Sequence, residues 1–238
     1  IDTSNTTVWS NGTWSNGVPD LSKDAILREP YEGDILANKL TFETDIVVKT
    51  GTTYTIYGAV INNSNQVTFE NEAYLVQMDQ STNYGDITFK VNSKPIYKSD
   101  IMDWSSPVSY QNIFALSPDT LPSTFSRFSE IENDWVNNIL PSETFFAMMP
   151  ISFAAPNNFN TYGQGEAKVF EAIFKGVPIN TSYGMPLSKI NKGYNGFGNP
   201  YSSPIDLNLF LQRNAIISNV FIWSTNQANI NGKYVSGN

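Results

Sequence analysis

A repeat of short apolar segments between residues 40 and 75 constrains the fold more than any other feature of the sequence. Three triplets with the order apolar, threonine, apolar lie 14 and then 13 residues apart: Leu40-Thr41-Phe42, Tyr54-Thr55-Ile56 and Val67-Thr68-Phe69. A second set of apolar triplets lies between them at about the same offset: Ile46-Val47-Val48, Ala59-Val60-Ile61 and Ala73-Tyr74-Leu75. Each repeat therefore holds two short strands, which bury a core only when successive coils stack.

This repeat predicts a short β-solenoid over about residues 20–90. Within it, Thr41, Thr55 and Thr68 are expected to lie in register, one in each coil. A meander of β-hairpins is the alternative, because the sequence shows only three repeats.

The character of the sequence changes after residue 90. The periodicity ends, prolines become frequent, and longer loops separate the apolar segments. The segment AKVFEAIFKG places Val169, Glu171, Ile173 and Lys175 on one face of a strand. Strands at this spacing predict a β-sandwich.

These patterns together predict an all-β fold with minor helix. The composition is consistent with this class, because 13% of the residues are aromatic, only 15% are charged, and aromatic side chains suit half-buried pleated faces. We expect a β-solenoid-like repeat domain at residues 1–90 and a β-sandwich-like domain at residues 91–238.

A glycine-rich segment, GYNGFGNPYSSPIDLNLFLQ at residues 193–212, raises the question of nucleotide binding. The order of Gly193, Gly196 and Gly198 differs from the dinucleotide fingerprint, no βαβ unit precedes them, and no P-loop lysine follows them. We expect these glycines to form a turn that packs under aromatic residues and binds no nucleotide: Tyr194, Phe197 and Tyr201.

A short helix is expected directly after this turn, at Ser203–Gln212. Ser203 would be its N-cap and Pro204 its first residue. One face of the helix would pack against the sheet through Leu207, Phe210 and Leu211.

Absent residue types restrict the chemistry more than the residues present. The sequence has no cysteine and no histidine. Thiolate nucleophiles, Ser-His-Asp triads and zinc sites with thiolate or imidazole ligands are therefore excluded. Carboxylate chemistry, Ser-Lys or Tyr arrangements and oxygen-ligated cations such as calcium remain.

The net charge of −8 argues against a nucleic-acid partner and against an anionic membrane surface, because both need a basic face. No apolar run reaches the length of about 18 residues that a membrane span requires.

Several residues remain as candidates for a site. Acids near aromatic residues could serve a carboxylate-dependent polysaccharide-acting enzyme, for which the two acids must face each other across a cleft: Asp100, Asp103, Glu130, Glu132 and Asp134. Calcium could bind at Asp20 and Asp24 or at Glu130, Glu132 and Asp134, although neither run matches a known calcium loop. Trp9 and Trp14 could form a sugar-binding platform or cover the end of the core.

Several motifs resemble those of a known group of proteins. The strings DWSSPVSYQNIFALSPDT (103–120), FSRFSEIENDWVN (125–137) and GFGNPYSSPIDLNLFL (196–211) resemble, in the same order, motifs of large secreted adhesin-like surface proteins of Bacteroidota. WSNGVP at 14–19 is similar to the opening of those proteins, before their solenoid coils, and Phe221-Ile222-Trp223 is similar to a later I-Y-x-W motif.

The resemblance implies export by the type IX system to the cell surface or medium, and it carries over no catalytic residue. Relatives continue into further strands and a sorting domain, so we expect this chain to be a portion of a longer protein.

We therefore expect a non-enzymatic extracellular adhesin or structural module of a bacterial surface protein, fibre or matrix, with no cofactor apart from the open question of calcium. Its expected partners are other copies of itself or other surface proteins, with glycans as further candidates. A carbohydrate-binding module and a polysaccharide-acting enzyme are the alternatives.

Overall fold

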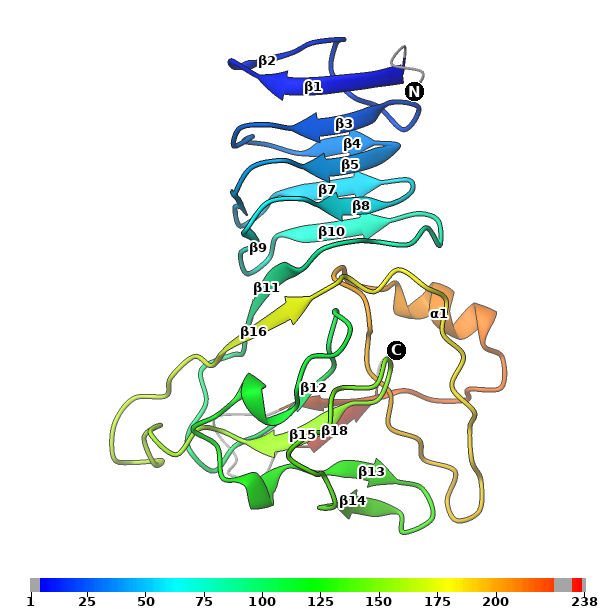
Figure 1. The fold of residues 1–238 in the computed structure, drawn as a ribbon. Helices are drawn as coiled ribbons and strands as arrows, with labels where there is room; N and C mark the ends of the chain where they lie inside the picture. The colour runs from blue at the N-terminus through cyan, green and yellow to red at the C-terminus, as the bar shows by residue number, and fades with distance from the viewer. Residues whose placement is uncertain (1–4, 225–232, 237–238) are drawn as a thin grey trace.

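The computed structural model describes residues 5–224 and 233–236, which are mostly β with one short helix. Figure 1 shows a stack of short strands at the N-terminal end and a loop-rich half with smaller sheets beyond it. The strands of the stack are β1 (Thr6–Ser10), β2 (Thr13–Trp14), β3 (Asp24–Leu27), β4 (Ile35–Ala37), β5 (Lys39–Phe42), β6 (Ile46–Val48), β7 (Thr53–Ile56), β8 (Val60–Asn62), β9 (Val67–Phe69), β10 (Tyr74–Gln77) and β11 (Ile87–Asn92).

The stack is a β-solenoid of about four turns over residues 6–89, so the predicted solenoid is confirmed. Its coils have three sides, because the chain passes in turn through three sheets with the orders β2-β1-β3-β5-β8, β16-β11-β9-β6 and β10-β7-β4. Successive coils pair in parallel: Leu40 aligns with Val60 on one side, and Ile46 aligns with Val67 on the next. The alternative, a meander of antiparallel hairpins, is therefore wrong.

One side of a coil takes seven residues. Strands β5 to β10 begin at residues 39, 46, 53, 60, 67 and 74. Three such sides give a coil of about 21 residues, which matches the separation of the aligned residues Ile46 and Val67. The 13- to 14-residue repeat in the sequence therefore spans two sides of the triangle and not a whole coil.

The expected stacking of the three threonines is wrong for this reason. Thr41, Thr55 and Thr68 lie on three different sides. Each lies between two buried apolar residues of its strand, and Thr68 is itself buried. Their partners in the neighbouring coils are Ile61, Val76 and Thr88, respectively.

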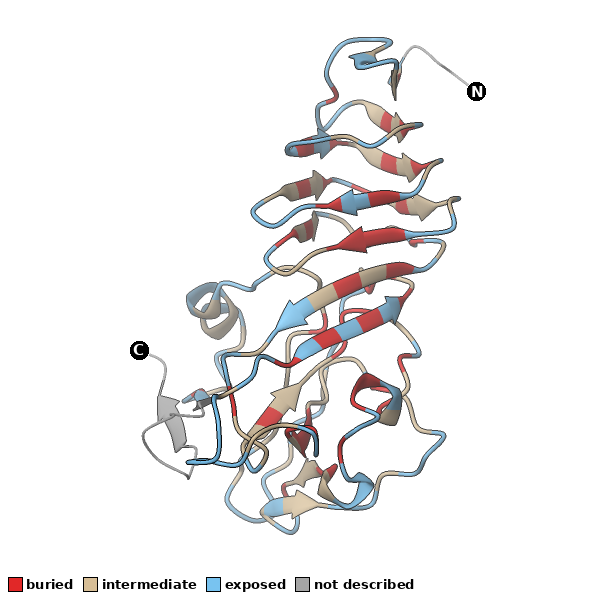
Figure 2. Cartoon of the chain, turned by 90° about the vertical axis from the view of Figure 1, so that its left-hand side faces the viewer, coloured by how far each residue is buried: buried red, intermediate tan, exposed pale blue. Residues whose placement is uncertain are grey.

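The interior of the solenoid is filled by alternate side chains of most of its strands, as in β3 to β7. Figure 2 shows this alternation as buried bands along the strands. Rings from different sides and from neighbouring coils meet in the core, with centroid distances of 6.4 Å from Phe42 to Tyr54, 5.6 Å from Tyr54 to Phe69 and 5.1 Å from Phe69 to Phe89. Burial of these rings and of the aliphatic side chains around them stabilises the repeat, because apolar area removed from water contributes about 25 cal/mol per Å².

The second half has small sheets where a β-sandwich was expected. In the described residues, three pairs of strands form separate two-stranded sheets, β12–β15, β13–β14 and β17–β18, joined by long loops. The elements of this half are β12 (Ile101–Trp104), η2 (Phe114–Leu116), η3 (Pro122–Thr124), β13 (Arg127–Ser129), β14 (Asp134–Val136), β15 (Ile151–Ala154), β16 (Glu171–Gly176), α1 (Leu207–Arg213), β17 (Phe221–Ser224) and β18 (Lys233–Ser236).

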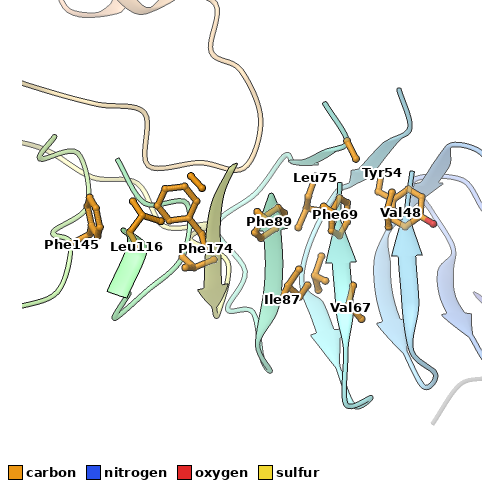
Figure 3. Close-up of a cluster of buried hydrophobic side chains, with 14 of the residues drawn as sticks. Val48, Tyr54, Val67, Phe69, Leu75, Ile87, Phe89, Leu116, Phe145 and Phe174 are labelled. Atoms are coloured by element: carbon orange, nitrogen blue, oxygen red, sulfur yellow. The ribbon is translucent and has the colours of Figure 1, made fainter. Parts of the chain in front are cut away.

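Strand β16 joins the two halves, because it pairs antiparallel with β11 over the whole length of both strands. Phe89 lies opposite Phe174 in this pair, and the Phe174 ring meets that of Phe145 at 6.1 Å. Figure 3 shows these side chains as one row that runs from the solenoid into the second half. The expected division after residue 90 therefore falls inside β11, between two segments that share a core.

The predicted helix is present but begins later than expected. Asp206, not Ser203, is the N-cap, and its carboxylate accepts a hydrogen bond from the backbone N–H of Leu209. The three residues of the expected apolar face, Leu207, Phe210 and Leu211, are half-buried, and the contact shown for this face is with the glycine-rich segment, where Phe210 stacks on Phe197 at 5.2 Å. None of the helices in the described part of the chain has the length and apolar character needed to cross a bilayer.

Candidate functional site

Glu130, one of the candidate acids, is buried and closes a distant loop. It follows β13, and its carboxylate accepts hydrogen bonds from the Ser188 hydroxyl and from the backbone N–H groups of Ile190, Asn191 and Gly193, at 2.7 to 2.9 Å. Burial of the Glu130 carboxylate favours its neutral form, but these four hydrogen bonds outweigh the effect and lower its pKa to about 2. This carboxylate stays ionised and is engaged in holding the loop.

The glycine-rich segment forms the other side of this arrangement. Gly193 has φ of +79°, which glycine adopts without strain, and this conformation turns its N–H toward Glu130. Gly198 donates its N–H to the carbonyl of Met148 at 2.7 Å and lies against Ser105. The glycines therefore allow close backbone approach, as expected for a structural turn.

The expected aromatic cover over these glycines is present in part. Tyr194 meets Phe221 edge to face at 5.9 Å, and Phe197 lies on the helix. The Tyr201 hydroxyl instead reaches the carbonyl of Thr181.

Asp103 lies on β12 opposite Ser152 of β15, and burial raises the pKa of its carboxyl group although a hydrogen bond from Ser152 acts in the other direction. One of its oxygen atoms, Oδ1, is buried without a partner among the described residues. Asp103 and Glu130 thus have pKa values shifted in opposite directions. Asp103 lies on β12, whereas Glu130 follows β13 and its carboxylate is occupied by hydrogen bonds from residues 188–193.

The other candidate acids are not gathered with these two. Asp100 accepts the N–H of Tyr97, and Asp134 accepts that of Trp135. Glu132 is exposed in the turn between β13 and β14, and Asp134 is exposed at the start of β14.

The residues of the two candidate calcium sites are engaged in hydrogen bonds within the chain. Asp20 accepts hydrogen bonds from the N–H and hydroxyl of Ser22, which lower its pKa, and Asp24 accepts one from Asn38. Among the residues that the structure describes, no group of three or more acidic side chains is placed to hold a metal ion.

Trp9 and Trp14 lie at the N-terminal end of the solenoid, where they pack with Tyr31 against the core. The centroid of the Trp9 ring is 5.4 Å from that of Trp14 and 4.9 Å from that of Tyr31, and the rings are tilted or edge to face. The Trp9 indole N–H donates to the carbonyl of Pro30. This geometry is that of a cap on the core, and it presents no flat pair of ring faces.

A polar groove with a volume of about 240 Å³ lies where the last coil meets the second half. One wall is the end of β10 and the turn after it, residues 75–80; the other is formed by residues 179–182 and 201–203. Figure 1 shows the chain after β16 running beside β10 at this place. Sequence reasoning missed the groove, because its walls come from segments about 100 residues apart.

Hydrogen bonds between the two segments fix this groove. Asn180 donates its amide to the carbonyl of Ser81 at 2.9 Å, and Ser202 donates its hydroxyl to the carbonyl of Leu75 at 3.0 Å. Behind the wall, the buried Asn83 exchanges amide hydrogen bonds with Gln77 and donates to the carbonyl of Pro178. The available signal in the sequence was the polar runs QMDQST and NTS, which follow buried strands.

A comparison of the sequence with protein families finds one whose profile matches residues 2–236, nearly the whole chain, and which is described as a domain of unknown function. No curated protein and no solved structure matches the chain. Because this profile covers nearly the whole chain, the chain belongs to the DUF8693 family.

Proposed function

We propose that the chain is a non-enzymatic extracellular adhesin or structural module of a bacterial surface protein. The observation that carries the proposal is the unbroken core, which joins a solenoid of stacked coils to a loop-rich half through the β11–β16 pair. Such a body holds loops at a fixed distance and orientation, and loops on a rigid scaffold are where binding groups concentrate.

The state of the candidate acids also supports a binding role over a hydrolytic one. A glycosidase needs two carboxyl groups about 5–10 Å apart across a cleft, one of them free to give a proton. Glu130 accepts hydrogen bonds from four donors, and Asp103 is half-buried in the β12–β15 pair, opposite Ser152. The resemblance to Bacteroidota surface proteins supports a location outside the cell.

Contact between copies follows from the solenoid geometry. At the N-terminal end, the three sheets finish at β2, β4 and β6, whose outer edges are open to pairing unless they are covered. β2 is short and lies beside the Trp9–Trp14 cap, which protects one of these edges. Self-association, if it occurs through this end, uses the two remaining edges.

The test combines location with adhesion. Intact cells of a native host are treated with protease, and loss of the chain without loss of a cytoplasmic marker is the expected result. Beads coated with the purified chain should adhere to surfaces or to each other, and electron microscopy of the chain distinguishes monomers from filaments. Protection from protease, or release of sugars from a polysaccharide panel, would contradict the proposal.

A further inference from the structure

The polar groove between residues 75–80 and 179–203 presents hydrogen-bonding groups that the fold does not use. Both oxygens of Asp79 are oriented by Ser81, one by its N–H at 2.8 Å and the other by its hydroxyl at 2.9 Å. Each carboxylate oxygen still has a second acceptor position. Gln80 is exposed, and within residues 5–224 its amide has no hydrogen-bond partner.

The same groove has an apolar component beside these polar groups. Leu75 and Ile179 form buried parts of its lining, while Met78 is 56% exposed. The ring of Tyr201 also lines it, and a hydrogen bond of 3.2 Å from its hydroxyl to the carbonyl of Thr181 holds the ring in place. A ligand with both hydroxyl groups and a C–H face matches this combination, because aromatic rings pack on C–H faces and amides bind hydroxyls.

The charge of the groove selects among such ligands. Among the described residues, Asp79 is the one charged side chain in its lining, and no lysine or arginine contributes to it. An anionic sugar or a phosphate would therefore meet a like charge without a compensating cation, which is unfavourable. The volume of about 240 Å³ lies below the 300–1,000 Å³ that is typical of drug-sized ligands, so the occupant is small.

We propose that this groove binds a neutral saccharide unit, with Asp79, Gln80 and Asn180 on its hydroxyl groups and Tyr201 on its C–H face. The inference rests on the proposed function, in that it names the ligand class of an adhesin. It places recognition at the junction of the two halves, whose hydrogen bonds to Ser81 and Leu75 fix both walls before a ligand arrives.

The test is a titration of the full chain followed by ¹H–¹⁵N NMR. The neutral probes are glucose, galactose, mannose and N-acetylglucosamine, and the anionic comparators are glucuronic acid and N-acetylneuraminic acid. We expect saturable shifts of the amide signals of residues 79–80, 180–182 and 202–203 with at least one neutral sugar. The anionic comparators should bind at least tenfold more weakly.

Two glutamine variants make the test specific. Gln80→Ala should weaken the binding about tenfold, the loss that follows from removing a hydrogen bond worth roughly 1.4 kcal/mol. Gln164→Ala removes another exposed glutamine outside the groove and should leave the binding unchanged. No shift with any neutral probe, tighter binding of the anionic sugars, shifts centred on the Trp9 and Trp14 indoles, or equal effects of the two variants would each overturn the inference.

The adhesion assay separates this inference from the proposed function. If titrations show no binding but coated beads adhere and the chain is accessible on intact cells, the groove assignment fails and the adhesin proposal stands. If the chain is protected from protease on intact cells, the adhesin proposal fails whatever the titrations show.

Discussion

At the scale of single residues, the hydroxyl of Tyr54 is a polar atom in the middle of the solenoid core. The Tyr54 side chain is fully buried, and its hydroxyl has no hydrogen-bond partner among the described residues. Burial raises its pKa, with a further contribution from the nearby Tyr31 and Asp34. A buried hydroxyl without a hydrogen-bond partner destabilises the folded state, so its removal should raise the stability of the chain.

Tyr54→Phe is therefore expected to raise the free energy of unfolding by about 1 kcal/mol, measured by urea denaturation. Tyr57→Phe is the matched control, because Tyr57 is exposed directly after β7. This substitution should change the free energy of unfolding by less than about 0.5 kcal/mol. A loss of stability in Tyr54→Phe would show that the hydroxyl is hydrogen-bonded in solution.

Glu130 makes the loop at residues 188–193 sensitive to acid. Its pKa lies at about 2 in the folded chain, below the ordinary value of 4.5. A lowered carboxyl pKa contributes stability that is fully present above pH 4.5 and is lost as the pH falls toward about 2. Hydrogen exchange at the amides of Ile190, Asn191 and Gly193 should lose protection across that window.

In Glu130→Gln, one side-chain oxygen and its charge are replaced by an N–H donor that faces the loop amides. We expect the loop amides to lose protection from hydrogen exchange already at neutral pH. The change in their exchange protection between pH 4.5 and 2 should become smaller than in the unmodified chain. Glu132→Gln, at an exposed position in the same turn, should behave as the unmodified chain. Identical pH profiles for both variants would contradict the role of Glu130.

At the scale of elements, the close approach of the glycine-rich segment to Ser105, the residue after β12, depends on the absence of a side chain at Gly198. A Cβ atom there would lie 2.5 Å from the Cβ of Ser105 and 2.9 Å from its Oγ. The reason for this glycine is therefore close approach, whereas a positive φ is the reason at Gly193.

Gly198→Ala should lower the free energy of unfolding by roughly 1–3 kcal/mol through overpacking. The second-site change Ser105→Gly should restore most of that loss, because it removes the colliding atoms and an Oγ that is buried without a partner in the described part of the chain. Gly184→Ala is the control, since a Cβ there meets nothing within 4 Å. Chemical denaturation of all three variants checks this, and failure of Ser105→Gly to rescue would count against the contact.

The strand patterns in the sequence predicted the solenoid but not its three-sided coil of about 21 residues. The triplet apolar–Thr–apolar reports that a strand has one buried face, and this holds on every side of the coil. Thr41, Thr55 and Thr68 look equivalent because each lies between two buried apolar residues, yet nothing in the triplet says which side of the coil it occupies. The seven-residue step of β5 to β10 was available from the spacing of all the strands.

Contacts between distant segments were beyond sequence reasoning for a different reason. Glu130 and its partners are about 60 residues apart, and the groove joins residues 75–80 to residues 179–203. Local patterns identify Glu130 as an acid and the glycines as a turn, but the pairing depends on tertiary packing. The helix cap illustrates the limit at short range, since Ser203 and Asp206 are both good N-caps and only the contacts in the folded chain decide between them.

At the scale of the whole molecule, the second half covers the C-terminal end of the solenoid. β11 has β9 on one side and β16 on the other, and Phe174 of β16 lies opposite Phe89. Without β16, one edge of β11 and the adjacent end of the core would be open to water and to other chains. We therefore expect the full chain to unfold in a single cooperative transition, although sequence composition changes near residue 90.

The decisive comparison is between the full chain and a fragment of residues 1–92, which retains all of β11. We expect the fragment to have a lower unfolding midpoint and to self-associate in analytical ultracentrifugation, because its last coil offers both an unpaired strand and uncovered rings. In the same fragment, Thr88→Lys places a charge on the outward face of β11, and it should reduce the self-association while leaving the midpoint low. A monomeric fragment as stable as the full chain would mean that the solenoid closes its own end, and that the division after residue 90 separates two independent domains.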